Sequence, residues 1–204
     1  MNSRSYQAVV SGDEATLEDF SSYTLLLEET PKENTVLHVA VLHKQRRVVE
    51  KLLQSHESLL YRKNSNGDTS LQLAAKIGSH DLAKILIDQE TKAARREVRF
   101  VVRGQRLGLR LQGNGVKLED SELASLKNSA GESSLFHAVA RKFFDITKHL
   151  LDETRKCSIA GRNGMNALRA AVIHLYRDTN FSGNESEQLG ATNSVQLLGK
   201  STYF

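Results

Sequence analysis

The apolar residues of this chain recur in short clusters that share one spacing. Each cluster has a leucine followed at i+3 and i+4 by smaller apolar residues, which places all three on one face of a short helix. The four clusters are Leu37, Ala40 and Val41; Leu71, Ala74 and Ala75; Leu135, Ala138 and Val139; and Leu168, Ala171 and Val172. Because their leucines are 34, 64 and 33 residues apart, the chain is predicted to consist of repeated units.

A second apolar cluster follows the first in three of the units. Its members are Val48, Val49, Leu52 and Leu53; Leu82, Ala83, Leu86 and Ile87; and Ile146, Thr147, Leu150 and Leu151. Each unit therefore predicts two antiparallel helices, which are too short to bury their apolar faces without a neighbour. The fold class predicted is all-α, a solenoid of stacked helix-turn-helix units with short hairpin loops.

Polar residues before the leucine of each cluster predict how the units begin. A glycine stands four residues earlier in three units, where a tight turn with positive φ is expected. These residues are Gly67, Gly131 and Gly164. A residue with a short oxygen-bearing side chain stands two residues before each leucine, which is typical of a helix N-cap. These residues are Thr35, Thr69, Ser133 and Asn166.

Four runs of sequence resemble the ankyrin repeat, with its G-x-T-P-L-H-x-A-A pattern and its period near 33. They are residues 34–40 (NTVLHVA), 66–75 (NGDTSLQLAA), 131–138 (GESSLFHA) and 164–171 (GMNALRAA). The resemblance covers roughly residues 5–176 with one interruption, and it implies an ankyrin-repeat solenoid. It also implies that His38, at the histidine position of the family, forms hydrogen bonds that brace neighbouring turns.

Within this family, residues 30–40 are most similar to plant ankyrin proteins tied to defence and cell death. Those proteins normally continue into a C-terminal multi-span membrane domain, which these 204 residues do not contain. The resemblance implies a scaffold role in plant defence signal transduction and an association with a membrane.

Two departures from the family pattern change the expected stability of the helix ends. The proline that usually presets the first turn is absent from all four runs, so helix initiation relies on neighbouring residues. The glycine that usually ends the first helix is present as Gly12 and Gly78 but is replaced by Lys44 and Lys142. A lysine in left-handed geometry costs about 1 kcal/mol or more, so these two units are expected to be looser.

The repeat pattern predicts one solenoid domain, residues 1–176, followed by a polar tail. The tail, residues 177–204, has too few apolar residues to offset the cost of ordering and is expected to be mobile. The units are predicted at about 3–31, 32–65, 66–90 and 129–162, with a partial unit at 163–176 and a basic insertion at about 91–127. The first is a degenerate unit expected to act as an N-terminal cap.

Positive charge is concentrated in the insertion, where residues 92–117 hold eight basic residues and one acid, Glu97, in a chain of net charge +4. Its central arginines are Arg95, Arg96, Arg99, Arg103, Arg106 and Arg110. A solvated loop, which solenoids tolerate, is the favoured interpretation. The alternatives are a patch for anionic lipid, nucleic acid or an acidic partner, and partial packing of the interleaved apolar residues on the outer helices.

The chain lacks the sequence patterns of common catalytic sites. It has no nucleophile elbow and no phosphate-binding loop, and its histidines lack metal-ligand spacing. One cysteine, Cys157, excludes an internal disulfide. We therefore expect a protein that is not an enzyme and that needs no cofactor or metal. Without a signal peptide or a run of about 18 apolar residues, it is expected in the cytoplasm, with a peripheral plasma-membrane location as an option, and not secreted.

Binding is the remaining function class, and stacked units place it on the concave surface formed by hairpin turns and inner helices. Candidate contacts beside the turns are Lys32, Glu33, Asn34, Asn66, Asp68, Glu132, Arg162 and Met165. Candidates on the inner helices are His43, Lys76, Arg141 and His174. The expected partner is a protein and no small-molecule substrate is expected. The alternative is attachment of residues 92–117 to an anionic membrane, with nucleic acid less favoured.

Overall fold

The computed structural model describes residues 1–18, 27–102, 123–154 and 157–181. The inner helices are α1 (Ser3–Ser11), α4 (Val36–Leu42), α6 (Ser70–Ile77), α8 (Ser134–Ala140) and α10 (Ala167–Phe181). The outer elements are α2 (Glu14–Glu18), α5 (Arg46–Ser55), α7 (His80–Val102) and α9 (Phe144–Glu153), with 3-10 turns η1 (Glu57–Tyr61) and η2 (Leu123–Ser125). None of the helices within these ranges is both long enough and apolar enough to cross a membrane.

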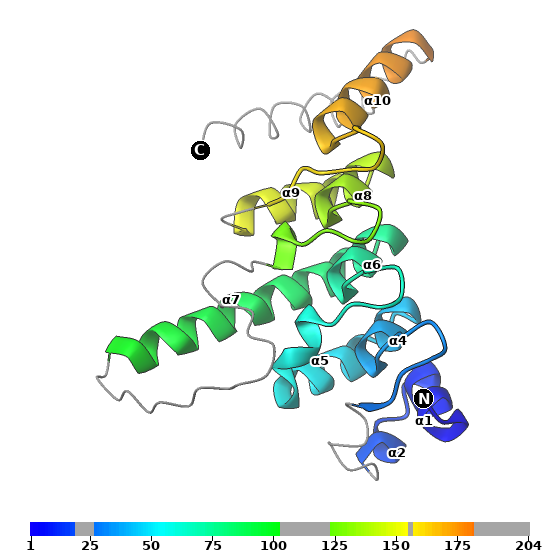
Figure 1. Ribbon diagram of the computed structural model, residues 1–204, viewed down its shortest axis with the longest axis vertical. Helices are drawn as coiled ribbons and strands as arrows, with labels where there is room; N and C mark the ends of the chain where they lie inside the picture. The colour runs from blue at the N-terminus through cyan, green and yellow to red at the C-terminus, as the bar shows by residue number, and fades with distance from the viewer. Residues whose placement is uncertain (19–26, 103–122, 155–156, 182–204) are drawn as a thin grey trace.

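The helices form two parallel layers, as the sequence predicts. Helices α1, α4, α6, α8 and α10 stack in one row, each packed on the next, while α5, α7 and α9 form the second row (Figure 1). Each inner helix of the three middle units also packs on the outer helix that follows it in the chain. This order of contacts has a translational axis, so the prediction of an all-α solenoid is confirmed.

The apolar clusters form the core between the two layers. Leu37, Leu71 and Leu135 are fully buried, and so are most residues of the outer-helix clusters. The fourth cluster differs, because Leu168 is only partly buried and the Val172 side chain is 48% exposed. Within the described residues no outer helix follows α10, so this side of its apolar face is left uncovered.

Two helices continue past the unit boundaries predicted from the repeat pattern. Helix α7 runs to Val102, through the predicted boundary at residue 90, and α10 runs to Phe181, past the boundary at residue 176. Both continuations lack glycine and proline, and residues 90–97 are rich in alanine, arginine and glutamate, which favour helix. The repeat pattern locates where units stop matching, whereas local propensity decides where a helix stops.

The predicted N-caps are confirmed at the start of all four inner helices from α4 to α10. In each case the side-chain oxygen accepts a hydrogen bond from the backbone N–H three residues later, which satisfies one of the free donors of the first turn. The pairs are Thr35 with His38 at 3.5 Å, Thr69 with Gln72 at 3.4 Å, Ser133 with Phe136 at 3.2 Å, and Asn166 with Arg169 at 2.8 Å.

The residues that end the inner helices adopt the predicted left-handed geometry. Gly78 has φ of 70°, and a Cβ built on it would lie 2.5 Å from Cζ of Phe143, so both conformation and space favour glycine. Lys44 and Lys142 also have positive φ, at 56° and 61°. The expected strain at these lysines is therefore present, because side chains with a Cβ are disfavoured in this region.

Candidate functional site

The hairpin turn before each central inner helix is shaped by an asparagine. The Asn64 side-chain oxygen accepts hydrogen bonds from the backbone N–H groups of Asn66 and Asp68, both at 3.0 Å. Asn128 makes the equivalent bonds to Ala130 and Glu132, at 3.0 and 2.9 Å. Sequence reasoning missed both asparagines. Their signal was that each stands three residues before a predicted turn glycine, 64 residues apart.

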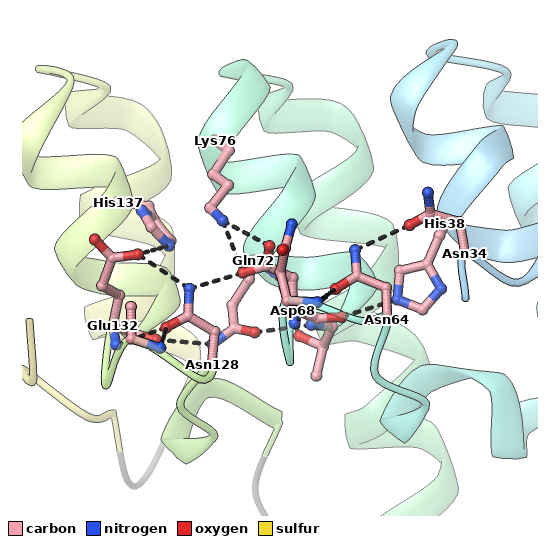
Figure 2. A network of polar contacts seen from close by, with 12 residues as sticks. Asn34, His38, Asn64, Asp68, Gln72, Lys76, Asn128, Glu132 and His137 are labelled. Atoms are coloured by element: carbon pink, nitrogen blue, oxygen red, sulfur yellow. Dashed lines mark hydrogen bonds and ion pairs between the residues drawn. The ribbon is translucent and has the colours of Figure 1, made fainter. Parts of the chain in front are cut away.

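The same asparagines join consecutive turns into a continuous polar ladder, which comprises Asn34, Asn64, Asp68, Asn128 and Glu132 (Figure 2). The Asn64 amide donates to Oδ1 of Asn34 at 2.9 Å. The Asn128 amide donates to Oδ1 of Asp68 at 2.9 Å and to Oε2 of Glu132 at 3.0 Å. Because both asparagines use their two polar ends, the ladder fixes the spacing of three successive turns.

His38 and Gln72 reinforce this spacing from the start of α4 and α6. His38 accepts a hydrogen bond at Nδ1 from the Thr35 N–H at 3.2 Å and donates from Nε2 to the Asp68 carbonyl at 3.0 Å. Burial lowers the pKa of His38, which keeps the ring neutral for this arrangement. Gln72 likewise donates to the Glu132 carbonyl at 3.0 Å. The bracing role implied for His38 is confirmed.

Two cations cover the acidic members of the ladder. The Lys76 ammonium contacts both carboxylate oxygens of Asp68, at 2.8 and 2.6 Å, and Arg162 Nε lies 3.0 Å from Oε1 of Glu132. Burial alone would raise the pKa of Glu132, but the Asn128 hydrogen bond and the nearby basic side chains lower it overall. Glu132 is therefore held as a carboxylate within the protein.

His137 is an unusual member of this site. Its position on α8 corresponds to Val39, Leu73 and Ala170 on the neighbouring inner helices, and the His137 side chain is only 2% exposed. Its Nε2 lies 3.6 Å from Oε2 of Glu132, which is too long for a hydrogen bond, and its Nδ1 lies 3.3 Å from Nη1 of Arg141. Burial, with the Lys76 charge next in importance, lowers the pKa of His137 to about 4, so the ring is neutral at pH 7.

We predict that His137→Leu reduces the loss of stability on acidification. The folded-state pKa of about 4 lies below the ordinary value of 6.5, so the unfolded chain binds this proton more readily. Above pH 6.5 the ring is neutral in both states and His137 does not lower the free energy of unfolding. As the pH falls from 6.5 toward 4, the unfolded chain takes up the proton first, so the free energy of unfolding falls. Leucine suits the position because Leu73 fills its equivalent on α6. Urea unfolding of both proteins at about pH 7.5 and about pH 5 measures the effect.

The groups that face His137 set the size of this effect. Lys76 and Arg141 disfavour the imidazolium, whereas Glu132 and Asp68 favour it. His38 and His149, whose pKa values are also lowered by burial, are common to both proteins and cancel in the comparison. An equal loss of unfolding free energy in the two proteins between these pH values would contradict the prediction.

The structure divides the predicted contact residues by exposure. Lys32, Glu33, His43, Asn66, Arg141 and Arg162 are exposed, and Asn34, Lys76, Met165 and His174 are partly buried. The prediction that Asp68 and Glu132 are partner contacts is corrected, because these residues are only 1% and 5% exposed. An asparagine and a cation enclose each carboxylate. Neither carboxylate is available to a partner without breaking the ladder.

The candidates nearest the two ends of the inner row make contacts between neighbouring helices. His43 at the end of α4 lies edge-on to the Tyr6 ring of α1, with ring centroids 6.1 Å apart. His174 on α10 contacts the Ala140 carbonyl of α8 through Nε2 at 3.2 Å. These residues therefore couple adjacent inner helices.

The predicted basic patch is only partly described. Arg95, Arg96 and Arg99 belong to the continuous helix α7, and the side chains of these three lie outside the described residues. Arg103, Arg106 and Arg110 lie outside the described residues altogether. In the described part of the chain no three histidine, cysteine, aspartate or glutamate side chains gather to hold a metal ion.

Repeated helix pairs, turns ending in glycine and threonine-capped inner helices braced by His38 and Gln72 together define an ankyrin-repeat solenoid. Residues 7–97 match the family described as ankyrin repeats (3 copies), so this part of the chain consists of ankyrin repeats. A comparison with curated proteins finds no match. The units built on α8 and α10 lie beyond the family match and continue the same stack (Figure 1).

Proposed function

We propose that the chain is a non-catalytic interaction module that binds a protein through the concave face of its solenoid. Ankyrin repeats generally mediate protein–protein interaction. The observation that carries the proposal is the exposure of varied side chains along the inner row, including Leu42 at 40%, Ile173 at 43%, and the charged Arg141. A row of exposed side chains on stacked units forms an extended binding surface.

The biological setting of this proposal comes from the similarity of residues 30–40 to plant defence ankyrin proteins. On this basis we propose that the interaction serves defence signal transduction, in the cytoplasm and at the inner surface of the plasma membrane. A partner that belongs to a defence pathway would support this part, whereas the concave-face interaction stands without it.

A second candidate function, favoured by the length of α7, is electrostatic attachment to an anionic membrane. This helix is 23 residues long and extends well past the ends of α5 and α9 (Figure 1), and Arg95, Arg96 and Arg99 lie in its last turns. Membrane attachment of this kind weakens steeply with salt, because exposed charges are screened. Vesicle binding that is insensitive to salt would exclude it.

The concave-face proposal is tested by comparing exposed cations on the two layers. Arg141→Glu changes the concave face, and Lys148→Glu makes the same change of charge on outer helix α9, where Lys148 is also exposed. In quantitative proximity labelling, we expect partners of the wild-type chain to persist with Lys148→Glu and to be depleted with Arg141→Glu. Retention of the same partners with both variants would contradict the proposal.

A further inference from the structure

Between residues 127 and 177, basic residues predominate on the inner layer of the solenoid, whereas the outer layer carries both exposed acids and the exposed Lys148. Between residues 127 and 177, the described acids other than the buried Glu132 all lie on α9: Asp145, Asp152 and Glu153. The hairpin turns and inner helices of the same region carry exposed basic residues, which are Lys127, Arg141, Arg162, Arg169 and Arg177. A partner approaching this part of the concave face therefore meets cations.

Two cations of this region, Arg141 and Arg162, belong to one connected network with Lys76 of α6. Asp68 holds the Lys76 ammonium, and Asn128 donates to the carboxylates of both Asp68 and Glu132 (Figure 2). Glu132 also holds Arg162, so Asn128 joins the two ion pairs. Arg141 joins them through His137, which lies beside Glu132. We call Lys76, Arg141 and Arg162 the cation cluster. Because the ladder positions it before binding, a ligand spends less free energy on ordering these side chains.

Exposure determines which charges of the network a partner can reach. The Glu132 and Asp68 side chains are 7% and 1% exposed, whereas those of Arg162 and Lys76 are 64% and 24% exposed. Guanidinium groups bind carboxylates through paired hydrogen bonds, which single ammonium groups cannot form. The buried acids thus act as supports, and the cation cluster is the surface they present.

We propose that the cation cluster binds carboxylate side chains of an acidic segment in a protein partner. This inference rests on the proposed function, because it names the class of partner that the concave face accepts. The three cations and the two buried carboxylates together carry a single net positive charge. This low charge density suits individual carboxylates of a partner. A nucleic acid, with its closely spaced phosphates, calls for a denser array of cations.

Apolar exposure on the inner row refines the partner. Ile173 on α10 occupies the position that Lys76 occupies on α6, and its side chain is 43% exposed. An exposed apolar side chain on the same face of the inner row as the cations favours a segment in which acidic residues alternate with apolar ones. The proposed partner segment is therefore both acidic and apolar.

A peptide-display selection against the whole chain tests this proposal. We expect the selected peptides to be enriched in aspartate and glutamate. The double variant Arg141→Gln with Arg162→Gln should weaken binding of a synthetic selected peptide at least about tenfold, as expected from the loss of charge-assisted hydrogen bonds. The matched control is Arg47→Gln with Lys148→Gln, which removes two exposed cations from outer helices and should leave the affinity unchanged.

Other outcomes separate this inference from the function on which it rests. Selected peptides without acidic residues, whose binding is nevertheless weakened by substitution of Arg141 or His43, would overturn the acidic partner. They would leave the concave-face function standing. Peptides insensitive to every concave substitution would overturn both. Tighter, cluster-dependent binding of a DNA duplex or of phosphatidylserine vesicles would replace the acidic segment by that class of ligand. Arg141→Gln alone keeps both ion pairs, Asp68 with Lys76 and Glu132 with Arg162. This single variant therefore remains informative if the double variant unfolds.

Discussion

Leu71→Ala is expected to lower the free energy of unfolding by about 2–5 kcal/mol, because it leaves a cavity in a tightly packed core. Leu71 is fully buried on α6, and α6 packs against α4 on one side and α8 on the other. The matched control is Leu42→Ala on α4, since Leu42 is 40% exposed and undergoes the same chemical change. Urea unfolding followed by circular dichroism measures both variants.

The central position of α6 makes a second effect of Leu71→Ala measurable. Each unit of a solenoid contacts only its neighbours, so a weak interface near the middle reduces the coupling between the two ends. The unfolding transition of Leu71→Ala is therefore expected to broaden as well as to shift. Equal destabilisation by the Leu71 and Leu42 substitutions would mean that the apolar clusters do not form the core.

Local features were predictable from the sequence because translational repetition shows the same requirement several times. Thr69 and Ser133 could be recognised as caps since they stand at one distance from the cluster leucines, and both form the expected bond. Lys142 could be assigned left-handed geometry because a glycine occupies its place in other units. These properties depend on a few neighbouring residues and on the repeat register alone.

Features that depend on other units could not be predicted in the same way. Asp68 resembled an exposed turn residue, and its burial depends on Asn128, which is 60 residues away in the sequence and bonds its carboxylate. Val172 shares the spacing of the buried clusters, yet its exposure is decided by the absence of an outer helix after α10 within the described residues. The candidate site needed the structure because its ladder joins side chains that are separated in the sequence by the insertion.

Asp68→Ala is expected to lower the free energy of unfolding by about 2–4 kcal/mol, because it removes the acceptor of several charge-assisted hydrogen bonds from a buried site. The 1% exposed carboxylate accepts two bonds from Lys76 and one from Asn128, and both donors lose these bonds. Asp152→Ala on α9 is the control, since this acid is exposed. Similar unfolding free energies for the two variants would show that the ladder does not stabilise the fold.

Removing both partners distinguishes the cost of an orphaned charge from the net contribution of the ion pair. Asp68→Ala leaves the Lys76 ammonium without its carboxylate, and the Lys76 side chain is only 24% exposed. We expect the double variant Asp68→Leu with Lys76→Met to be destabilised less than Asp68→Ala, because no partly buried charge is then left unpaired. In that case the pair contributes little net stability, and the result would agree with the proposal that it holds Lys76 in position for a partner.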